Sequence, residues 1–285
     1  MADFVIKTLE ETTRAIEQSV FADRFSSMNG FLQGLDPRVK VVTFFALLIV
    51  TAWMKTLPLL IGIYIITLIL AILSRLPIVF FVKRVWIFIP IFTGVIALPA
   101  IFNIVTPGTP LLVLWHFPHA YHFGPYTIPS SIAITSQGLR GGAILVMRVA
   151  ASVSIAILLV LTTEWTRLLK SLSVLHVPEM VILVLAMTYR YIFLFLRVVE
   201  GMFLGRKSRL ISDSDIKEQH NWLAARIGVL IGKSYNISNE VHLAMISRGW
   251  DGNPILMEDF NMRVRDWIWT FLVIVAIGMW LYFRR

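Results

Sequence analysis

The 285-residue chain lacks cysteine, and only 15% of its residues are charged. The absence of cysteine excludes disulfides, thiolate nucleophiles and cysteine-based metal sites. Walker A and glycine-rich phosphate-binding loops are also missing, so the chain is not expected to hydrolyse ATP by itself. Residues 1–34 mix acidic, basic and apolar residues without a hydrophobic core segment, and we therefore expect no signal peptide there.

Apolar residues are abundant instead. They make up 57% of the chain, and the mean hydropathy is +0.76. A soluble domain is usually about 45–50% apolar and about 25% charged. Long apolar runs that are typical of helical spans account for the difference. The composition predicts an all-α, multi-pass protein of the plasma membrane, in direct contact with the lipid bilayer.

The apolar runs predict about five transmembrane helices. An amphipathic lead-in, 1–34, precedes a region of four spans, 35–162; a polar helical region, 163–263, and a last span, 264–285, follow. Asp36 is suited to cap the first span and Pro37 to occupy its first position, while Arg38 and Lys40 are expected to anchor its cytoplasmic end. The predicted spans cover about 39–55, 58–74, 85–104, 142–161 and 267–282.

Charge is distributed unevenly along the chain. No Asp or Glu lies between Lys55 and Thr163, whereas thirteen of the 26 Lys and Arg residues fall between Glu164 and Arg265. A basic block next to apolar spans indicates a cytoplasmic face rather than a nucleic-acid-binding surface. The uncharged segment 105–138 is then expected to be an outward-facing loop with short apolar pieces.

Residues 178–196 leave the number of spans open. They are long enough to cross about 30 Å of hydrocarbon at 1.5 Å per residue. A sixth span here would carry the following basic residues to the outside. The positive-inside rule therefore favours five spans, although it then leaves Arg284 and Arg285 outside.

Two long amphipathic helices are predicted in the polar region, from about Pro178 to Arg209 and from about His220 to Arg248. Gly249 suits the position after the second helix, where glycine adopts the left-handed conformation without penalty. Arg248 is then in the last turn, where the helix dipole favours a cation. Taken alone, such an arginine is more often explained as a solvated charge at the helix end.

Three segments of the chain resemble one known family. They are Leu35–Lys40, Gly205–Arg209 and Ser238–Gly252, the last with the sequence SNEVHLAMISRGWDG. On these segments the chain resembles the transmembrane T component of energy-coupling factor (ECF) transporters, most closely its cobalt-type branch, CbiQ. The resemblance extends over nearly the whole chain from about Leu35.

The resemblance implies a non-catalytic subunit that transmits ATP-driven motion. Its partners would be two ABC-type ATPases, a separate substrate-binding membrane subunit for cobalt, and a small accessory membrane subunit. Nickel or a vitamin is the alternative substrate. A membrane enzyme that acts on a lipid, through the outward loop and Arg148, is the alternative from another class. No cofactor is implied.

The family has two X-Arg-X triplets, typically Ala-Arg-Gly or Ala-Arg-Ser, at the ends of two coupling helices that dock on the ATPases. Ser208-Arg209-Leu210 and Ser247-Arg248-Gly249 occupy those places here. Both triplets have serine where alanine is usual, and the first lacks a small third residue. Arg206 is therefore a competitor for the role of Arg209.

Three histidines and one arginine are further candidate site residues. His116, His119 and His122 lie in the outward loop, and imidazole binds cobalt and nickel. Because their spacing does not define a site, loop histidines are the preferred interpretation, and no metal site is predicted. Arg148 lies inside the fourth predicted span, where it is either functional or extended toward the outer interface.

Overall fold

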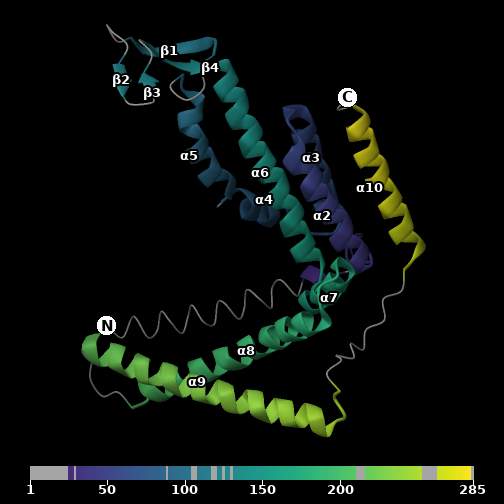
Figure 1. Cartoon of the computed structure of the whole chain (residues 1–285), viewed down its shortest axis with the longest axis vertical. Coiled ribbons are helices and arrows are strands. Elements are labelled where there is room, and N and C mark those ends of the chain that lie inside the picture. The colour runs from purple at the N-terminus through teal and green to yellow at the C-terminus, as the bar shows by residue number, and fades with distance from the viewer. Residues whose placement is uncertain are drawn as a thin grey trace. The chain divides into compact units, whose positions relative to one another are not determined.

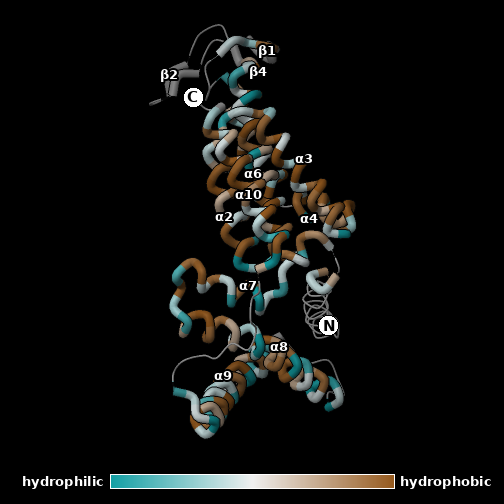
Figure 2. The backbone as a smooth tube through the Cα atoms, turned by 90° about the vertical axis from the view of Figure 1, so that its right-hand side faces the viewer, coloured by the Kyte–Doolittle hydropathy of each residue, from teal (hydrophilic) through white to brown (hydrophobic). Residues whose placement is uncertain are grey.

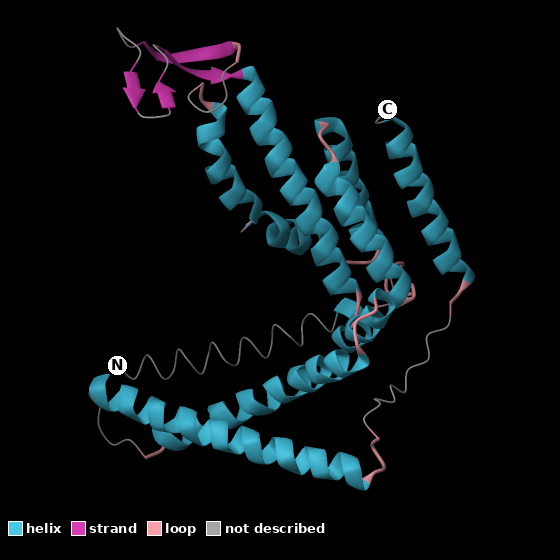
Figure 3. Ribbon diagram, in the orientation of Figure 1, coloured by secondary structure: helices cyan, strands magenta, loops and turns pink. Residues whose placement is uncertain are grey.

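A computed structural model gives the fold of most of the chain. It describes residues 25–28, 30–87, 89–103, 108–116, 121–123, 126–128, 131–209, 216–251 and 262–283. Side chains are not described at 112–132, 216, 219 and 283. Nearly all of the described regular structure is helical, and the strands are confined to one short stretch of sequence (Figure 3). The prediction of an all-α membrane protein is confirmed.

The chain divides into two compact units. The bundle unit contains Ala22–Ser171 together with Phe260–Arg285, and the paired-helix unit contains Leu172–Asp259. The helices of the bundle unit are α2 (Pro37–Trp53), α3 (Leu57–Leu73), α4 (Ile78–Trp86), α5 (Ile89–Ile101), α6 (Ser136–Thr162), α7 (Trp165–Ser171) and α10 (Val264–Phe283) (Figure 1). The paired-helix unit contains the short 3-10 helix η1 (Leu172–Leu175), α8 (Glu179–Lys207) and α9 (Ile216–Ser247).

Most predicted helices begin and end within a few residues of the observed ones. Asp36 is the N-cap residue of α2, and its side chain accepts a hydrogen bond from the Arg38 N–H, as the Asp-Pro pair predicts. The fourth predicted span begins too late, because Thr135 caps α6 by accepting from the Gly138 N–H at 3.2 Å. The helical segment that corresponds to the third predicted span begins earlier than predicted, because it consists of α4 followed by α5.

The segment 105–138 is not simply a loop. It contains two antiparallel pairs of strands, in which β1 (Pro110–His116) pairs with β4 (Ser131–Thr135) and β2 (Tyr121–Phe123) pairs with β3 (Tyr126–Ile128). The sequence in these strands is rich in aromatic and β-branched residues, which favour extended structure. The prediction missed them because prolines and glycines interrupt the alternation of residue types.

The larger of two apolar clusters in the described part of the bundle unit joins most of its helices. It joins Phe44 of α2, Leu70 of α3, Phe81 of α4, Leu158 of α6 and Trp269 of α10. Apolar residues predominate along α2, α3, α6 and α10 (Figure 2). Many of the outer ones are exposed within the chain, as expected for helices that face lipid.

Polar residues connect the helix ends at one end of the bundle. The Asp266 carboxylate accepts hydrogen bonds from the Asp36 N–H at 2.8 Å and from the Arg263 N–H at 2.7 Å. The Lys40 ammonium donates to the Thr162 carbonyl at 3.0 Å. Lys40 is 1% exposed, and this hydrogen bond ties the start of α2 to the end of α6, a contact that the sequence did not predict.

Arg148 also has a definite partner in the bundle. Its guanidinium donates a 2.7 Å hydrogen bond to the carbonyl of Met54, the C-cap residue of α2. Because α6 begins at Ser136, Arg148 lies more than three turns into the helix, farther from its start than the predicted span 142–161 implied. A cation at the C-terminus of α2 is favoured by the helix dipole.

Four helical segments in the described part of the chain are long and apolar enough to cross a membrane. These are Ile78–Ile101, Ser136–Thr162, Glu179–Lys207 and Val264–Tyr282, and Leu57–Leu73 is a shorter apolar helix. They make the chain a multi-pass membrane protein. The segment Glu179–Lys207 qualifies by length and composition, so the choice between five and six spans still depends on the distribution of charge.

We predict that replacing Asp266 by alanine destabilises the bundle unit. The change leaves two backbone N–H groups without their acceptor in a site where Asp266 is 2% exposed. The loss is expected to be roughly 1–3 kcal/mol. Thermal unfolding in detergent should show a midpoint lower by several degrees, whereas Glu240→Ala on the exposed surface of α9 should leave the midpoint unchanged. Equal midpoints for both variants would contradict this role.

We also predict that residues 205–265 are cytoplasmic and that residues 105–138 face outward. In this cysteine-free chain, Ser136→Cys and Lys217→Cys introduce single labels at exposed positions in these two regions. An impermeant thiol reagent applied to intact cells should label the first variant only, and both variants should be labelled after lysis. Labelling of the Lys217 variant on intact cells would mean that α8 crosses the membrane.

Candidate functional site

The ends of α8 and α9 carry the arginines that the sequence singles out. Helix α8 ends at Lys207, with Ser208 as its C-cap residue, and the Arg209 N–H donates to the Arg206 carbonyl at 3.0 Å. Arg209 is exposed. Leu210, the third residue of the first triplet, lies outside the described residues. The first triplet therefore marks the point where the chain leaves α8.

Helix α9 ends in a Schellman motif. The Trp250 N–H donates to the Met245 carbonyl at 3.1 Å, and the Gly249 N–H donates to the Ile246 carbonyl at 2.9 Å. Gly249 has a φ of 81°, which confirms the predicted left-handed position after the helix. Arg248 is the last residue before this turn, and its side chain is exposed.

In each triplet, the serine at the usual alanine position donates a hydrogen bond to the carbonyl three residues earlier. The Ser208 hydroxyl donates to the Gly205 carbonyl at 3.1 Å, and the Ser247 hydroxyl donates to the Ala244 carbonyl at 3.0 Å. Both carbonyls belong to the last turn of a helix, where backbone acceptors lack partners within the helix. Serine at these places thus retains a small side chain and satisfies a terminal carbonyl.

Helices α8 and α9 contact each other where they cross (Figure 1). The rings of Phe203 on α8 and Trp222 on α9 lie 5.3 Å apart, and Phe203 is 6% exposed. The guanidinium groups of Arg206 and Arg226 lie 4.5 and 5.5 Å from the centre of the Trp222 ring. This cluster combines apolar packing with cation–π attraction, which fastens the end of α8 to the first half of α9.

The cluster distinguishes Arg206 from Arg209. Both residues line a cavity of about 510 Å³ with Glu218 and Arg226. Arg206 is partly buried and is held against Trp222, whereas Arg209 is exposed at the end of the helix. The sequence left both residues as candidates for one role, and the structure gives them different surroundings. Arg226 follows Trp222 by one helical turn, a spacing that could have revealed half of the cluster.

The two triplets are far apart. Arg209 shares its cavity with Trp222, and Arg248 lies 26 residues (248 − 222) farther along the same helix. At 1.5 Å per residue this corresponds to about 40 Å. A single pocket of a partner protein would be too small to contact both arginines.

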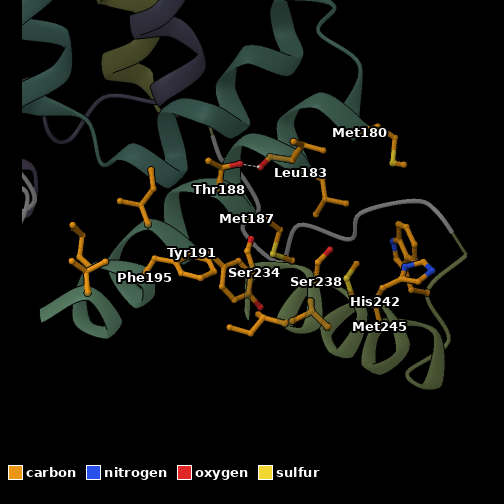
Figure 4. A pocket seen from close by; sticks show the side chains of 17 residues that line it. Met180, Leu183, Met187, Thr188, Tyr191, Phe195, Ser234, Ser238, His242 and Met245 are labelled. Carbon is orange, nitrogen blue, oxygen red and sulfur yellow. Dashed lines mark hydrogen bonds between the residues drawn. The ribbon is translucent and has the colours of Figure 1, made fainter. Parts of the chain in front are cut away.

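An apolar groove of about 680 Å³ lies between the first part of α8 and the last part of α9. Figure 4 shows side chains of both helices directed into it, with Met187, Tyr191 and Phe195 from α8 and His242 and Met245 from α9. Trp250 lines the groove beyond the end of α9, and its ring packs edge-on against His242 at 5.9 Å. A groove of this composition suits an apolar partner surface.

The candidate histidines do not form a described site. His116 belongs to β1 and His122 to β2, which are in different sheets; their side chains are not described, and His119 lies outside the described residues. Among the described residues there is no group of three or more His, Asp or Glu side chains that could hold a metal ion.

The fold defines a class of protein, a multi-pass membrane protein with a pair of long, arginine-terminated helices. Comparison with known proteins identifies its family. The family model described as cobalt transport protein, CbiQ, matches residues 28–258. The chain belongs to this family of membrane transport proteins.

Three known proteins are similar to the chain over most of their length. An uncharacterized protein of Methanocaldococcus jannaschii is 33% identical over 279 residues, which cover 98% of this chain and 91% of that protein. A second uncharacterized protein of the same organism is 25% identical over 80% of each chain. The energy-coupling factor transporter transmembrane protein EcfT of Staphylococcus aureus is 23% identical over 92% of this chain and 96% of its own length.

We predict that Trp222→Ala loosens the end of α8. The variant removes the ring that contacts Phe203 and attracts Arg206 and Arg226. Amide hydrogen exchange across residues 201–207 should accelerate by roughly tenfold, which corresponds to about 1.4 kcal/mol of lost packing. Tyr235→Ala, at an exposed position of α9, serves as the control. Unchanged exchange in the Trp222 variant would show that the cluster does not fasten α8.

Proposed function

We propose that the chain is the transmembrane T component of an ECF-type importer. It would transmit motion from two ABC-type ATPases to a separate membrane subunit that binds the substrate. Membership in the cobalt transport protein family and the likeness to a protein named EcfT support this assignment. The chain itself would be non-catalytic, in keeping with the absence of phosphate-binding sequences.

The observation that carries the proposal is the pair of exposed arginines at two separate helix ends. Arginine is permanently charged and binds carboxylates in bidentate fashion, so it suits a docking contact that must bear force. Arg209 and Arg248 would each insert into the surface of one ATPase. Their separation of about 40 Å along α9 favours two ATPase subunits over one.

The residues around the arginines have supporting roles in this proposal. Ser208 and Ser247 complete the last helical turns, and Gly249 provides the sharp turn that leaves Arg248 at the helix end. Arg206 would act by holding α8 on Trp222 rather than by docking itself. Truncating either docking arginine would then affect recruitment directly, whereas changes at Arg206 would act through the position of α8.

The apolar groove between α8 and α9 is the proposed contact for the substrate-binding membrane subunit. Its lining includes Met180, Met187 and Met245, and methionine side chains adapt readily to different apolar partner surfaces. Movement of the ATPases would displace the helix ends, and the groove would change shape with them. Motion would thus pass between the partners through two stiff helices and their crossing.

The proposed substrate is cobalt, following the description of the family. Nickel is the first alternative, and a vitamin is the second. The ion would be held by the separate membrane subunit, with a small accessory membrane subunit as a further partner. The present chain would then need no metal site of its own, and it would contribute coupling rather than selectivity.

We predict that Arg248→Glu weakens assembly with the ATPases without unfolding the protein. Removing one member of a buried ion pair at an interface costs about 2–5 kcal/mol, and charge reversal adds repulsion. Binding should therefore fall by at least about tenfold, and cobalt uptake should fall with it. Arg209→Glu should weaken binding less, and the double variant should abolish recruitment in a pull-down of the ATPases.

The matched control reverses two charges elsewhere on the same helices. Arg197 on α8 and Lys233 on α9 are exposed but lie away from the helix ends. Arg197→Glu/Lys233→Glu should retain recruitment, uptake and membrane insertion. If the Arg209→Glu/Arg248→Glu variant recruits the ATPases and supports uptake as well as this control does, the docking assignment is wrong.

A further inference from the structure

A polar cavity of about 640 Å³ lies within the bundle unit, at the end where α2 and α10 begin and α6 ends. No residue of α8 or α9 lines it, and none of its lining residues belongs to the proposed docking site. The segment before α2, the α6–α7 junction and the start of α10 all contribute to its lining. Its charged lining residues are Lys40, Glu164, Arg167, Arg263 and Arg265.

Positive charge predominates in this cavity. The only acid among its lining residues, Glu164, is paired with Arg167 at 3.2 Å. Arg263 and Arg265 are exposed, and neither has an ion-pair partner among the residues that the structure describes. Lys40 adds a buried ammonium group behind them.

The carboxylates of Asp36 and Asp266 lie near this end of the bundle but do not line the cavity. Both attract the Lys40 ammonium, and both accept backbone N–H groups at helix starts. The two exposed arginines are consequently available to an external anion.

Two buried polar atoms beside the cavity lack partners within the described part of the chain. Thr163 is 4% exposed, and its hydroxyl makes no hydrogen bond. The Gln33 side-chain oxygen is also unpaired, although its amide nitrogen donates to the carbonyls of Phe25 and Ser74 at 3.2 and 3.0 Å. Buried polar atoms are normally satisfied, so these atoms point to a ligand that both accepts and donates hydrogen bonds.

Exposed aromatic residues on α10 favour a location of the cavity near a membrane surface. Trp267 follows Arg265 in the first turn of α10 and is 68% exposed, and exposed tryptophans are enriched at membrane interfaces. Phe271, one turn farther along α10, is 67% exposed and continues the apolar surface into the span. A ligand with a charged head and apolar chains would match both features.

We propose that this cavity binds the headgroup of an anionic phospholipid. Arg263 and Arg265 hold the phosphodiester, and Lys40 strengthens the positive potential from within the bundle. Headgroup hydroxyls donate to Gln33, while the acyl chains lie along the apolar surface of α10 that begins at Trp267. Phosphatidylglycerol has this combination of one negative charge and free hydroxyls, and basic pockets beside membrane helices commonly hold such lipids.

The test measures the lipid retained by the purified full-length chain. Protein reconstituted in phosphatidylcholine with a minor share of phosphatidylglycerol is returned to neutral detergent, washed, and analysed by mass spectrometry. Wild type should retain phosphatidylglycerol selectively. Arg263→Gln/Arg265→Gln should bind it roughly thirtyfold more weakly, given the usual contribution of a basic residue to binding an anionic lipid. Thr163→Val, which removes only a hydroxyl, should weaken retention roughly fivefold.

Lys83→Gln/Arg140→Gln is the matched control, because it removes two exposed positive charges of the bundle unit that do not line the cavity. It should retain the lipid, and all variants should keep the wild-type unfolding midpoint. If this control loses the lipid equally, the lipid is attracted by positive charge anywhere on the bundle unit, and the proposal is wrong.

Two further measurements distinguish a bound lipid from other occupants of the cavity. Displacement of the lipid by millimolar inorganic phosphate would assign the cavity to a free phosphate instead. If the Arg263→Gln/Arg265→Gln variant loses ATPase recruitment but keeps the lipid, the cavity docks a protein and the proposal fails. Loss of lipid with recruitment unchanged is the expected result, and it leaves the proposed docking role of α8 and α9 unaffected.

Discussion

Asp266 accepts the backbone N–H groups of both Asp36 and Arg263, and this carboxylate holds two helix starts together across 230 residues of sequence. Lys40 completes the junction by donating to the last carbonyl of α6. Asp36, Lys40, Thr162 and Asp266 are buried, where an unpaired polar group is costly. The three helices α2, α6 and α10 therefore have a fixed arrangement at this end, and the apolar core extends from it.

The paired-helix unit is built on a different principle. Among the described residues, the cluster around Trp222 joins α8 to α9, and an apolar groove lies between other parts of the two helices. Long helices with one fastening point are stiff along their axes but have few contacts that resist a change in their angle. This property suits the proposed role of passing motion between partners.

The sequence predicts the helices well because their signals are local. The Asp-Pro pair before α2, the apolar runs, and Gly249 after α9 each specify a boundary through short-range chemistry. It predicts the long-range contacts poorly. The sequence places Lys40 at the end of the first span and Arg148 inside the fourth, but it does not reveal that they donate to the carbonyls of Thr162 and Met54. The family resemblance indicates the arginine triplets, but only the stacking of Arg206 on Trp222 separates that residue from Arg209.

The central claim, that the two helix ends contact ATPase subunits, is tested most directly by site-specific crosslinking in the assembled complex. Single cysteines in place of Ser208 and Ser247 lie next to the two arginines, and a cysteine in place of Ser136 at the start of α6 is the reference. The account predicts that a short thiol-reactive crosslinker joins the first two positions, but not the third, to ATPase subunits. Crosslinks absent from both triplets in an intact complex would contradict it.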